Sequence, residues 1–190
     1  MSLNLPIYEL KLNNLDDGVF CISLVEYPAI EEDFLVFDSQ SPINFTKIDE
    51  DKHILYGPAM IPEMLIYRRD ESGREYYVKF SKETIAEIVE RFARNNYISN
   101  ISLNHETPVE GCFVFNSYLI DRKSGIDPIQ FKDIEDGSWI VGVKVDNLSV
   151  WNEVKNTDLL RGFSVEVLAT PYKMSKEDNW LNNLFKGVLK

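Results

Sequence analysis

The chain has 190 residues, of which 44% are hydrophobic and 12% aromatic, and 31 acidic against 20 basic residues give it a net charge of −11. This apolar content excludes an intrinsically disordered chain and suffices for one packed domain. The acidic balance argues against a nucleic-acid partner, because phosphate binding needs clustered lysine and arginine. The chain shows no signal peptide and no apolar run long enough to cross a bilayer, so we expect an intracellular protein with no membrane partner.

Apolar runs and alternating patterns predict short strands along most of the chain. We expect them at residues 5–12, 19–25, 34–37, 53–61, 64–67, 76–80, 101–105, 112–120, 138–145 and 160–168. The run at 19–25 is apolar enough for a strand that is buried on both faces. Gly57-Pro58 predicts a bend or bulge, and residues 68–73 read as a hairpin tip.

Three helices are predicted among these strands. Ser81 caps the clearest one, which ends at Asn95-Asn96 and carries an apolar stripe at helical spacing. The stripe consists of Ile85, Ile88, Val89 and Phe92. Ser149 caps a short helix to about Asn156, with Val150, Trp151 and Val154 facing inward. An amphipathic helix is expected at 175–187.

Many short strands with two or three helices predict an α+β fold with a mostly antiparallel sheet or barrel. We expect one domain over residues 1–190, in which strands at 5–37 complete the sheet. The long polar loop at 121–137 is of the kind that often faces a substrate. Cys21 and Cys112 are expected to be buried free thiols, too few for a metal site. No cofactor-binding motif is present, so we expect neither a metal nor a cofactor.

The strand at 160–168 carries the most suggestive polar residues. Alternation places Phe163, Val165 and Val167 on one face, and Ser164, Glu166 and Leu168 on the other. The sequence Gly162-Phe163-Ser164-Val165-Glu166 is not the Gly-x-Ser-x-Gly elbow of α/β-hydrolases. A serine also needs an adjacent base to act as a nucleophile, and most serines in strands have none.

The chain has only two histidines, so each is informative. His105 is expected to end a strand and to share a face with Ile101 and Leu103. It is either a core or rim histidine that is satisfied by a backbone carbonyl, or a general base. His53 lies in a charged run and is expected to be a solvated surface residue.

Glu166 follows Ser164 by two residues, a spacing of about 6.5–7 Å along a strand. An imidazole that is hydrogen-bonded through both nitrogens spans a similar distance, so His105 can contact Ser164 with one nitrogen and Glu166 with the other. The alternative for Glu166 is a salt bridge to Arg161 or a lysine. Glu106 is a poorer candidate, because it is expected on the opposite face from His105.

An ordered set of motifs resembles the prohead (capsid maturation) proteases of tailed bacteriophages, which are similar to herpesvirus assemblins. The motifs lie within residues 50–170 and are Ile-Ser-Leu-Asn-His105-Glu, Cys-Phe-Val-Phe-Asn-Ser-Tyr-Leu-Ile, Asp-Gly-Ser-Trp139-Ile-Val-Gly-Val-Lys-Val, the Trp151 helix and Arg-Gly-Phe-Ser164-Val-Glu. The histidine strand and the Gly-Phe-Ser strand carry most of the resemblance.

The resemblance implies an assemblin-like β-barrel with flanking helices. It also implies a serine endopeptidase in which Ser164 is the nucleophile and His105 the general base, with a backbone N–H group stabilising the oxyanion. The substrates would be phage scaffold and major capsid proteins. The enzyme would be a homo-oligomer in the host cytoplasm, inside assembling proheads, and would also cleave itself.

Many phage proteases carry, after the catalytic serine, a strand that reads Glu-x-Ser-Leu-Val, followed by Pro-Ala. Here a similar run begins at Cys21, near the N-terminus. The resemblance therefore implies a circular permutation in which Cys21 stands at the glutamate position. Glu166 then becomes the leading third catalytic residue, with Glu26 behind it.

The sequence is also compatible with two other functions. The first is a virion structural or assembly protein that keeps the protease fold without activity. The second is an acyl hydrolase of small molecules, which would use the same serine and histidine without the elbow.

Overall fold

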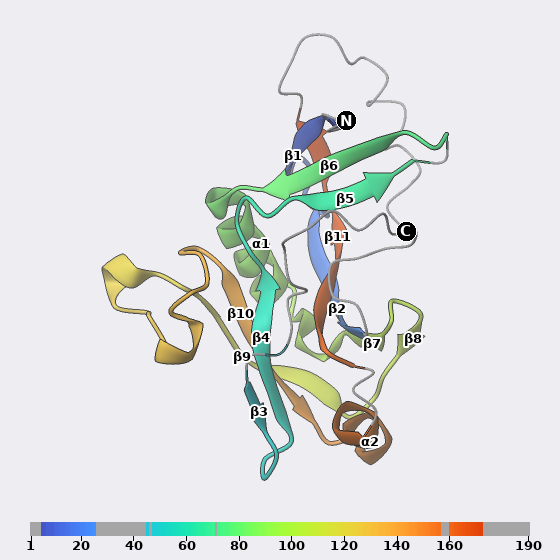
Figure 1. Ribbon diagram of the computed structural model, residues 1–190, viewed down its shortest axis with the longest axis vertical. Coiled ribbons are helices and arrows are strands. Elements are labelled where there is room, and N and C mark those ends of the chain that lie inside the picture. The colour runs from blue at the N-terminus through green and yellow to red at the C-terminus, as the bar shows by residue number, and fades with distance from the viewer. Residues whose placement is uncertain (1–4, 26–44, 46, 71, 157–159, 173–190) are drawn as a thin grey trace.

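The computed structural model describes residues 5–25, 45, 47–70, 72–156 and 160–172. These residues form an α+β fold with three four-stranded sheets and two α-helices (Figure 1). The predicted elements at 34–37 and 175–187 lie outside this part of the chain. Within it, no helix is both long and apolar enough to cross a membrane.

Each sheet combines strands that are distant in sequence. The first has the order β12 (Thr170–Tyr172), β1 (Ile7–Lys11), β6 (Glu75–Phe80), β5 (Ile66–Arg69). The second has the order β3 (Lys47–Asp49), β4 (Ile54–Met60), β10 (Trp139–Val145), β9 (Cys112–Leu119). The third has the order β11 (Gly162–Leu168), β2 (Gly18–Val25), β7 (Ile101–Leu103), β8 (Thr107–Pro108).

The pairing is mostly antiparallel, as predicted. The parallel pairs are β1 with β6 and β2 with β7. The predicted irregularity at Gly57-Pro58 is confirmed, because the register of β4 against β10 shifts between Pro58 and Met60. All three sheets are open in the pairings of the described residues, so the closed barrel stays a prediction.

Helix α1 (Lys82–Arg94) packs against β2 and β10. Ser81 is its N-cap, as predicted, and its side chain accepts a hydrogen bond from the backbone N–H of Thr84. In the predicted stripe, Ile85, Ile88 and Phe92 are fully buried. The Phe92 ring meets Trp139 edge to face, with 5.1 Å between centroids. This helix therefore joins the second sheet to the third.

Helix α2 (Leu148–Asn156) buries Val150, Trp151 and Val154, as predicted. Its cap is Asn147, not Ser149, because Asn147 immediately precedes the first turn and its Oδ1 accepts from the N–H groups of residues 149 and 150. His53 is not merely solvated. Its ring stacks on Trp151, with 4.5 Å between centroids.

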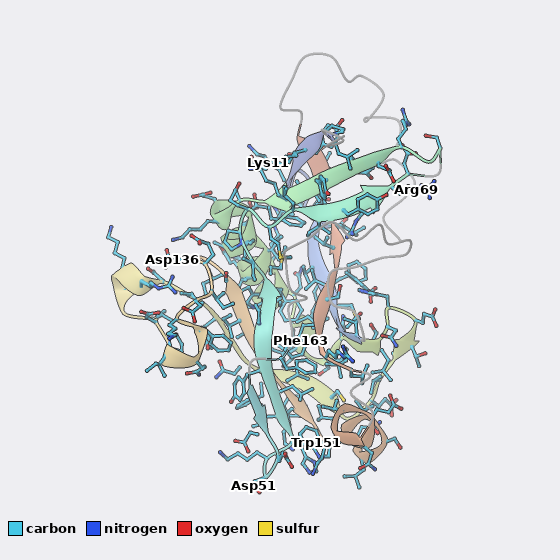
Figure 2. The ribbon with its side chains drawn as sticks, viewed as in Figure 1. Lys11, Asp51, Arg69, Asp136, Trp151 and Phe163 are labelled. Atoms are coloured by element: carbon cyan, nitrogen blue, oxygen red, sulfur yellow. The ribbon has the colours of Figure 1, made fainter. Side chains whose placement is uncertain are left out.

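The polar loop at 121–137 contains two 3₁₀ turns, η2 (Arg122–Ser124) and η3 (Ile129–Phe131). Phe131 packs in a small apolar cluster with Ile120 and Ile140. Figure 1 shows the loop, in yellow, beyond β10 on the side away from β7 and β8, and Figure 2 labels Asp136 within it. The loop is thus far from the residues predicted to do chemistry.

The tip of the β5–β6 hairpin is organised by Asp70, whose side chain is 1% exposed. Its carboxylate accepts hydrogen bonds from the Ser72 N–H and hydroxyl and from the Arg74 N–H and Nε. Burial opposes ionisation of Asp70, but these hydrogen bonds outweigh it and lower the pKa to about 2.

We expect Asp70→Asn to lower the free energy of unfolding by about 1–3 kcal/mol at pH 7, because the hydrogen bonds to a buried carboxylate are lost. The pKa in the folded protein lies below the ordinary value of 3.8, so this contribution is present above about pH 4 and is lost as pH falls towards 2. Urea unfolding at pH 7 and pH 3 should therefore show a smaller difference between the two proteins at pH 3. An equal difference at both pH values would contradict the assignment.

Candidate active site

The polar face of the third sheet carries the site, and its other face is packed in the core. In the register of the sheet, Ser164 on β11 lies opposite Ser23 on β2, and Ser23 lies beside Ser102 on β7. Phe163 is 1% exposed and points into the interior between β4 and β2 (Figure 2). Val165 and Val167 also pack against the core. The predicted division of β11 into an apolar and a polar face is confirmed.

His105 lies in a tight turn, not in a strand. β7 ends at Leu103, and the Glu106 N–H donates to the Leu103 carbonyl over 2.9 Å. Asn104 and His105 have φ values of 46° and 61°, so the turn is of type I′. The turn interrupts the strand alternation. The ring consequently lies on the face of Ser102, and the predicted face, shared with Ile101 and Leu103, is wrong.

The turn brings the imidazole to two groups on the sheet. His105 Nδ1 lies 3.1 Å from Ser23 Oγ and 3.6 Å from Glu166 Oε1. The side chains of His105 and Glu166 are 27% and 26% exposed. The predicted pairing of His105 with Glu166 is therefore present as a close approach. Among the described residues, no arginine or lysine forms a salt bridge with Glu166.

Two buried serines lie beneath this pair. Ser23 is 0% exposed and Ser102 is 5% exposed, with 2.6 Å between their Oγ atoms. Both hydroxyls lie within hydrogen-bond distance of Glu166 Oε1, Ser23 at 3.1 Å and Ser102 at 3.0 Å. Neither serine was predicted to belong to the site. The feature of the sequence that marks them is a single polar residue within each of two apolar strands.

Ser164 lies beside this cluster and is half-buried. Among the described residues, neither its hydroxyl nor the Nε2 atom of His105 has a recorded hydrogen-bond partner. The structure thus places Ser164 on the same face as His105 and Glu166 without joining it to the ring. Glu26, the other candidate acid, lies outside the described residues.

Cys21 lies opposite Glu166 in the register of β2 and β11. Its thiol is free and half-buried, and burial raises its pKa to about 11. Burial likewise raises the pKa of the buried Cys112 thiol to about 11. Within the described part of the chain, no three acidic, cysteine or histidine side chains gather in a way that could hold a metal ion.

We expect both cysteines to react with iodoacetamide at pH 7.5 at least about tenfold more slowly than a free thiol, because the thiolate is the reacting form. Mass spectrometry of the native and urea-unfolded protein measures the two rates. Rapid alkylation of Cys21 in the native protein would show that its thiolate is available and would contradict the raised pKa.

A serine hydroxyl, an imidazole and a carboxylate on one face are the groups of a serine-hydrolase site. The chain belongs to a family of phage serine proteases: residues 43–173, more than half of its length, match the family model described as "Putative phage serine protease XkdF". The matched range includes Ser102, His105, Ser164 and Glu166, whereas β2 precedes it. No curated protein and no solved structure matches the chain.

Proposed function

We propose that the protein is a serine endopeptidase that cleaves scaffold and major capsid proteins during prohead maturation, with Ser164 as nucleophile and His105 as general base. The family supports the reaction class. The observation that carries the assignment of residues is the orientation of the imidazole. Its Nδ1 faces Glu166 and the buried serines, which leaves Nε2 for a proton from Ser164, the division of roles found in Ser-His-Asp triads.

Ser23 lies within hydrogen-bond distance of the imidazole, but its burial argues against a nucleophilic role. A nucleophile must reach a peptide carbonyl, and Ser23 is 0% exposed and surrounded by other polar groups. Ser164 is half-buried, in register with Ser23 and on the same face. Nucleophile–base hydrogen bonds are often long or unformed in a free enzyme and tighten only when the substrate binds.

In the proposed reaction, Ser164 Oγ attacks the scissile carbonyl while His105 Nε2 takes the hydroxyl proton. The imidazolium then gives this proton to the leaving amine as the C–N bond breaks. Water hydrolyses the acyl-enzyme, and His105 Nε2 takes its proton and returns one to Ser164 Oγ. A backbone N–H group is the proposed oxyanion donor.

Glu166 is the proposed third member. It lies directly opposite Cys21, which the resemblance places at the usual glutamate position. A carboxylate from β11 can therefore serve the imidazole where one from β2 is missing. β2 lies beside the Ser164 strand, and this supports the proposed circular permutation of an assemblin-like barrel. We place the enzyme, as a homo-oligomer, inside proheads in the host cytoplasm.

Co-expression with the scaffold and major capsid proteins of the same phage tests the proposal. We expect shortened forms of one or both proteins, and a serine-directed phosphonate should add its mass to the peptide that contains Ser164. Unprocessed capsid proteins together with an unlabelled Ser164 would favour the alternative, a virion structural or assembly protein without activity. Label on a different residue would reassign the nucleophile.

Glu166→Gln is expected to lower kcat by about 10²–10⁴-fold, because an amide cannot stabilise the imidazolium as a carboxylate does. Glu106→Gln is a matched control, since it removes the same charge from an exposed side chain next to His105 in sequence. Cleavage of a peptide that spans a processed site measures both variants. Equal activity of the two would exclude Glu166 as the third member.

A further inference from the structure

The direct contact between His105 and Glu166 is too long to be a hydrogen bond. Nδ1 and Oε1 are 3.6 Å apart, beyond the range of about 2.7–3.2 Å for an N–H···O bond. Ser23 Oγ is within hydrogen-bond distance of both, 3.1 Å from each atom. The hydroxyl group of Ser23 therefore bridges the carboxylate of Glu166 and the ring of His105.

Counting protons assigns a direction to these hydrogen bonds. Ser23 and Ser102 have one hydroxyl proton each, and an ionised Glu166 only accepts. Two hydroxyl oxygens only 2.6 Å apart require a proton between them, so one serine must donate to the other. Two arrangements then give the carboxylate a donor: Ser23 donates to Ser102 and Ser102 to Glu166 Oε1 over 3.0 Å, or Ser102 donates to Ser23 and Ser23 to Glu166 Oε1 over 3.1 Å.

In both arrangements Ser23 gives its only proton away, to Ser102 or to Glu166, so Ser23 must accept from His105. The ring therefore has its proton on Nδ1. The opposite assignment has Ser23 donating to Nδ1 and Ser102 to Ser23. It leaves Glu166 Oε1 at 3.1 and 3.0 Å from two hydroxyl oxygens with no proton in either contact, and such contacts are repulsive. Every group is satisfied when Nδ1–H donates to Ser23 and one of the two serines donates to Glu166.

We propose that Ser23 is a positioning residue. With Ser102 it forms a hydrogen-bonded relay between Glu166 and His105, and this relay fixes the Nδ1–H tautomer of the ring. The relay leaves Nε2 unprotonated and able to accept a proton. Its role in catalysis rests on the proposed function, whereas the tautomer does not. Both serines are shielded from water, and hydrogen bonds are electrostatically stronger in such surroundings.

The two serines are not equivalent in this relay. Without the Ser102 hydroxyl, Ser23 can turn its proton directly to Glu166 Oε1, which is 3.1 Å away. Without the Ser23 hydroxyl, nothing in the described cluster joins Nδ1 to the carboxylate. The relay therefore predicts a large effect for Ser23→Ala and a small one for Ser102→Ala. Two serines that merely satisfy each other in the core would give no such order.

Nitrogen NMR of the histidine rings tests the tautomer without any substrate. The chain has two histidines, so His53→Gln assigns the signals in protein labelled with ¹⁵N-histidine. At pH 9, where a histidine ring is ordinarily neutral, we expect a protonated Nδ1 and an unprotonated Nε2 in the wild type. We expect Ser23→Ala to move the ring towards the Nε2–H form, and Ser102→Ala to move it less.

Ser138→Ala is the matched control. Its hydroxyl is fully buried, lies outside the cluster and has no hydrogen-bond partner among the described residues. We expect this variant to leave the tautomer unchanged. An unprotonated Nδ1 in the wild type, or an unchanged tautomer in folded Ser23→Ala, would overturn the relay. If Ser23→Ala does not fold, the relay is tested by the tautomer in the wild type and by its smaller change in Ser102→Ala.

Peptide cleavage separates the relay from the proposed function. We expect Ser23→Ala to lower kcat by about 10²-fold with little change in KM, because a general base contributes about 10²–10⁴-fold. A wild type that has the Nδ1–H tautomer but cleaves nothing would keep the relay and refute the protease. Cleavage by Ser23→Ala at the wild-type kcat would keep the protease and refute the relay.

Discussion

Ser164→Ala is expected to abolish processing, with a loss of at least about 10⁴-fold in kcat/KM, because the acyl-enzyme can no longer form. The fall should be in kcat, since Ser164 lies at the surface of the cluster and removing one oxygen leaves the sheet face intact for peptide binding. Gel analysis of co-expressed capsid proteins shows the loss, and a peptide that spans a processed site gives its size.

Ser124→Ala is a suitable control for this experiment. Ser124 is exposed in the loop at 121–137, on the far side of β10, and its side chain makes no recorded contact with the site. It should process capsid proteins at the wild-type rate. Undiminished processing by Ser164→Ala would remove Ser164 as the nucleophile and, with it, the proposed mechanism.

His105→Ala is expected to lower kcat/KM by about as much as Ser164→Ala does, because Ser164 then has no base to take its proton. The effects of the two substitutions on the rate should not be additive. Residues that act as a unit lose their joint contribution when either is removed, so the double variant should be no slower than either single one. Single-turnover cleavage measures all three proteins on one scale.

His53→Ala removes the other histidine and serves as the comparison. His53 stacks on Trp151 beside the second sheet, so its loss should cost about 1 kcal/mol of stability and leave cleavage intact. A double variant much slower than either single variant would mean that Ser164 and His105 act independently. That result would contradict a shared proton transfer.

Local patterns in the sequence were sufficient to predict α1, the longer strands and the two faces of β11, but not the short strands β3, β8 and β12. These features depend on residues close together in the chain, such as the Ser81 cap and the alternation around Ser164. The face of His105 was predicted wrongly because the type I′ turn there has no glycine. Asn-Gly signals such a turn and Asn104-His105 does not.

Ser23 and Ser102 could not be predicted as partners for a different reason. Each is one hydroxyl within an apolar strand, and 79 positions separate them. Their contact depends on the parallel pairing of β2 with β7, which is set by the packing of the whole chain. The carboxylate of Glu166 was found because its spacing from Ser164 on one strand is a local property.

β2 is a central strand of the third sheet, so the candidate site forms only when β2 has paired with both of its neighbours. Ser23 meets Glu166 across 143 positions, so the site draws on an early strand and on one near the end of the chain. Contacts between such distant positions form late, because closing a long loop costs entropy before any contact repays it. A nascent chain that has not yet paired β11 with β2 would therefore lack the proposed Ser23–Glu166 contact. If the proposed function holds, the order in which the strands pair would keep the enzyme latent during synthesis without an inhibitor.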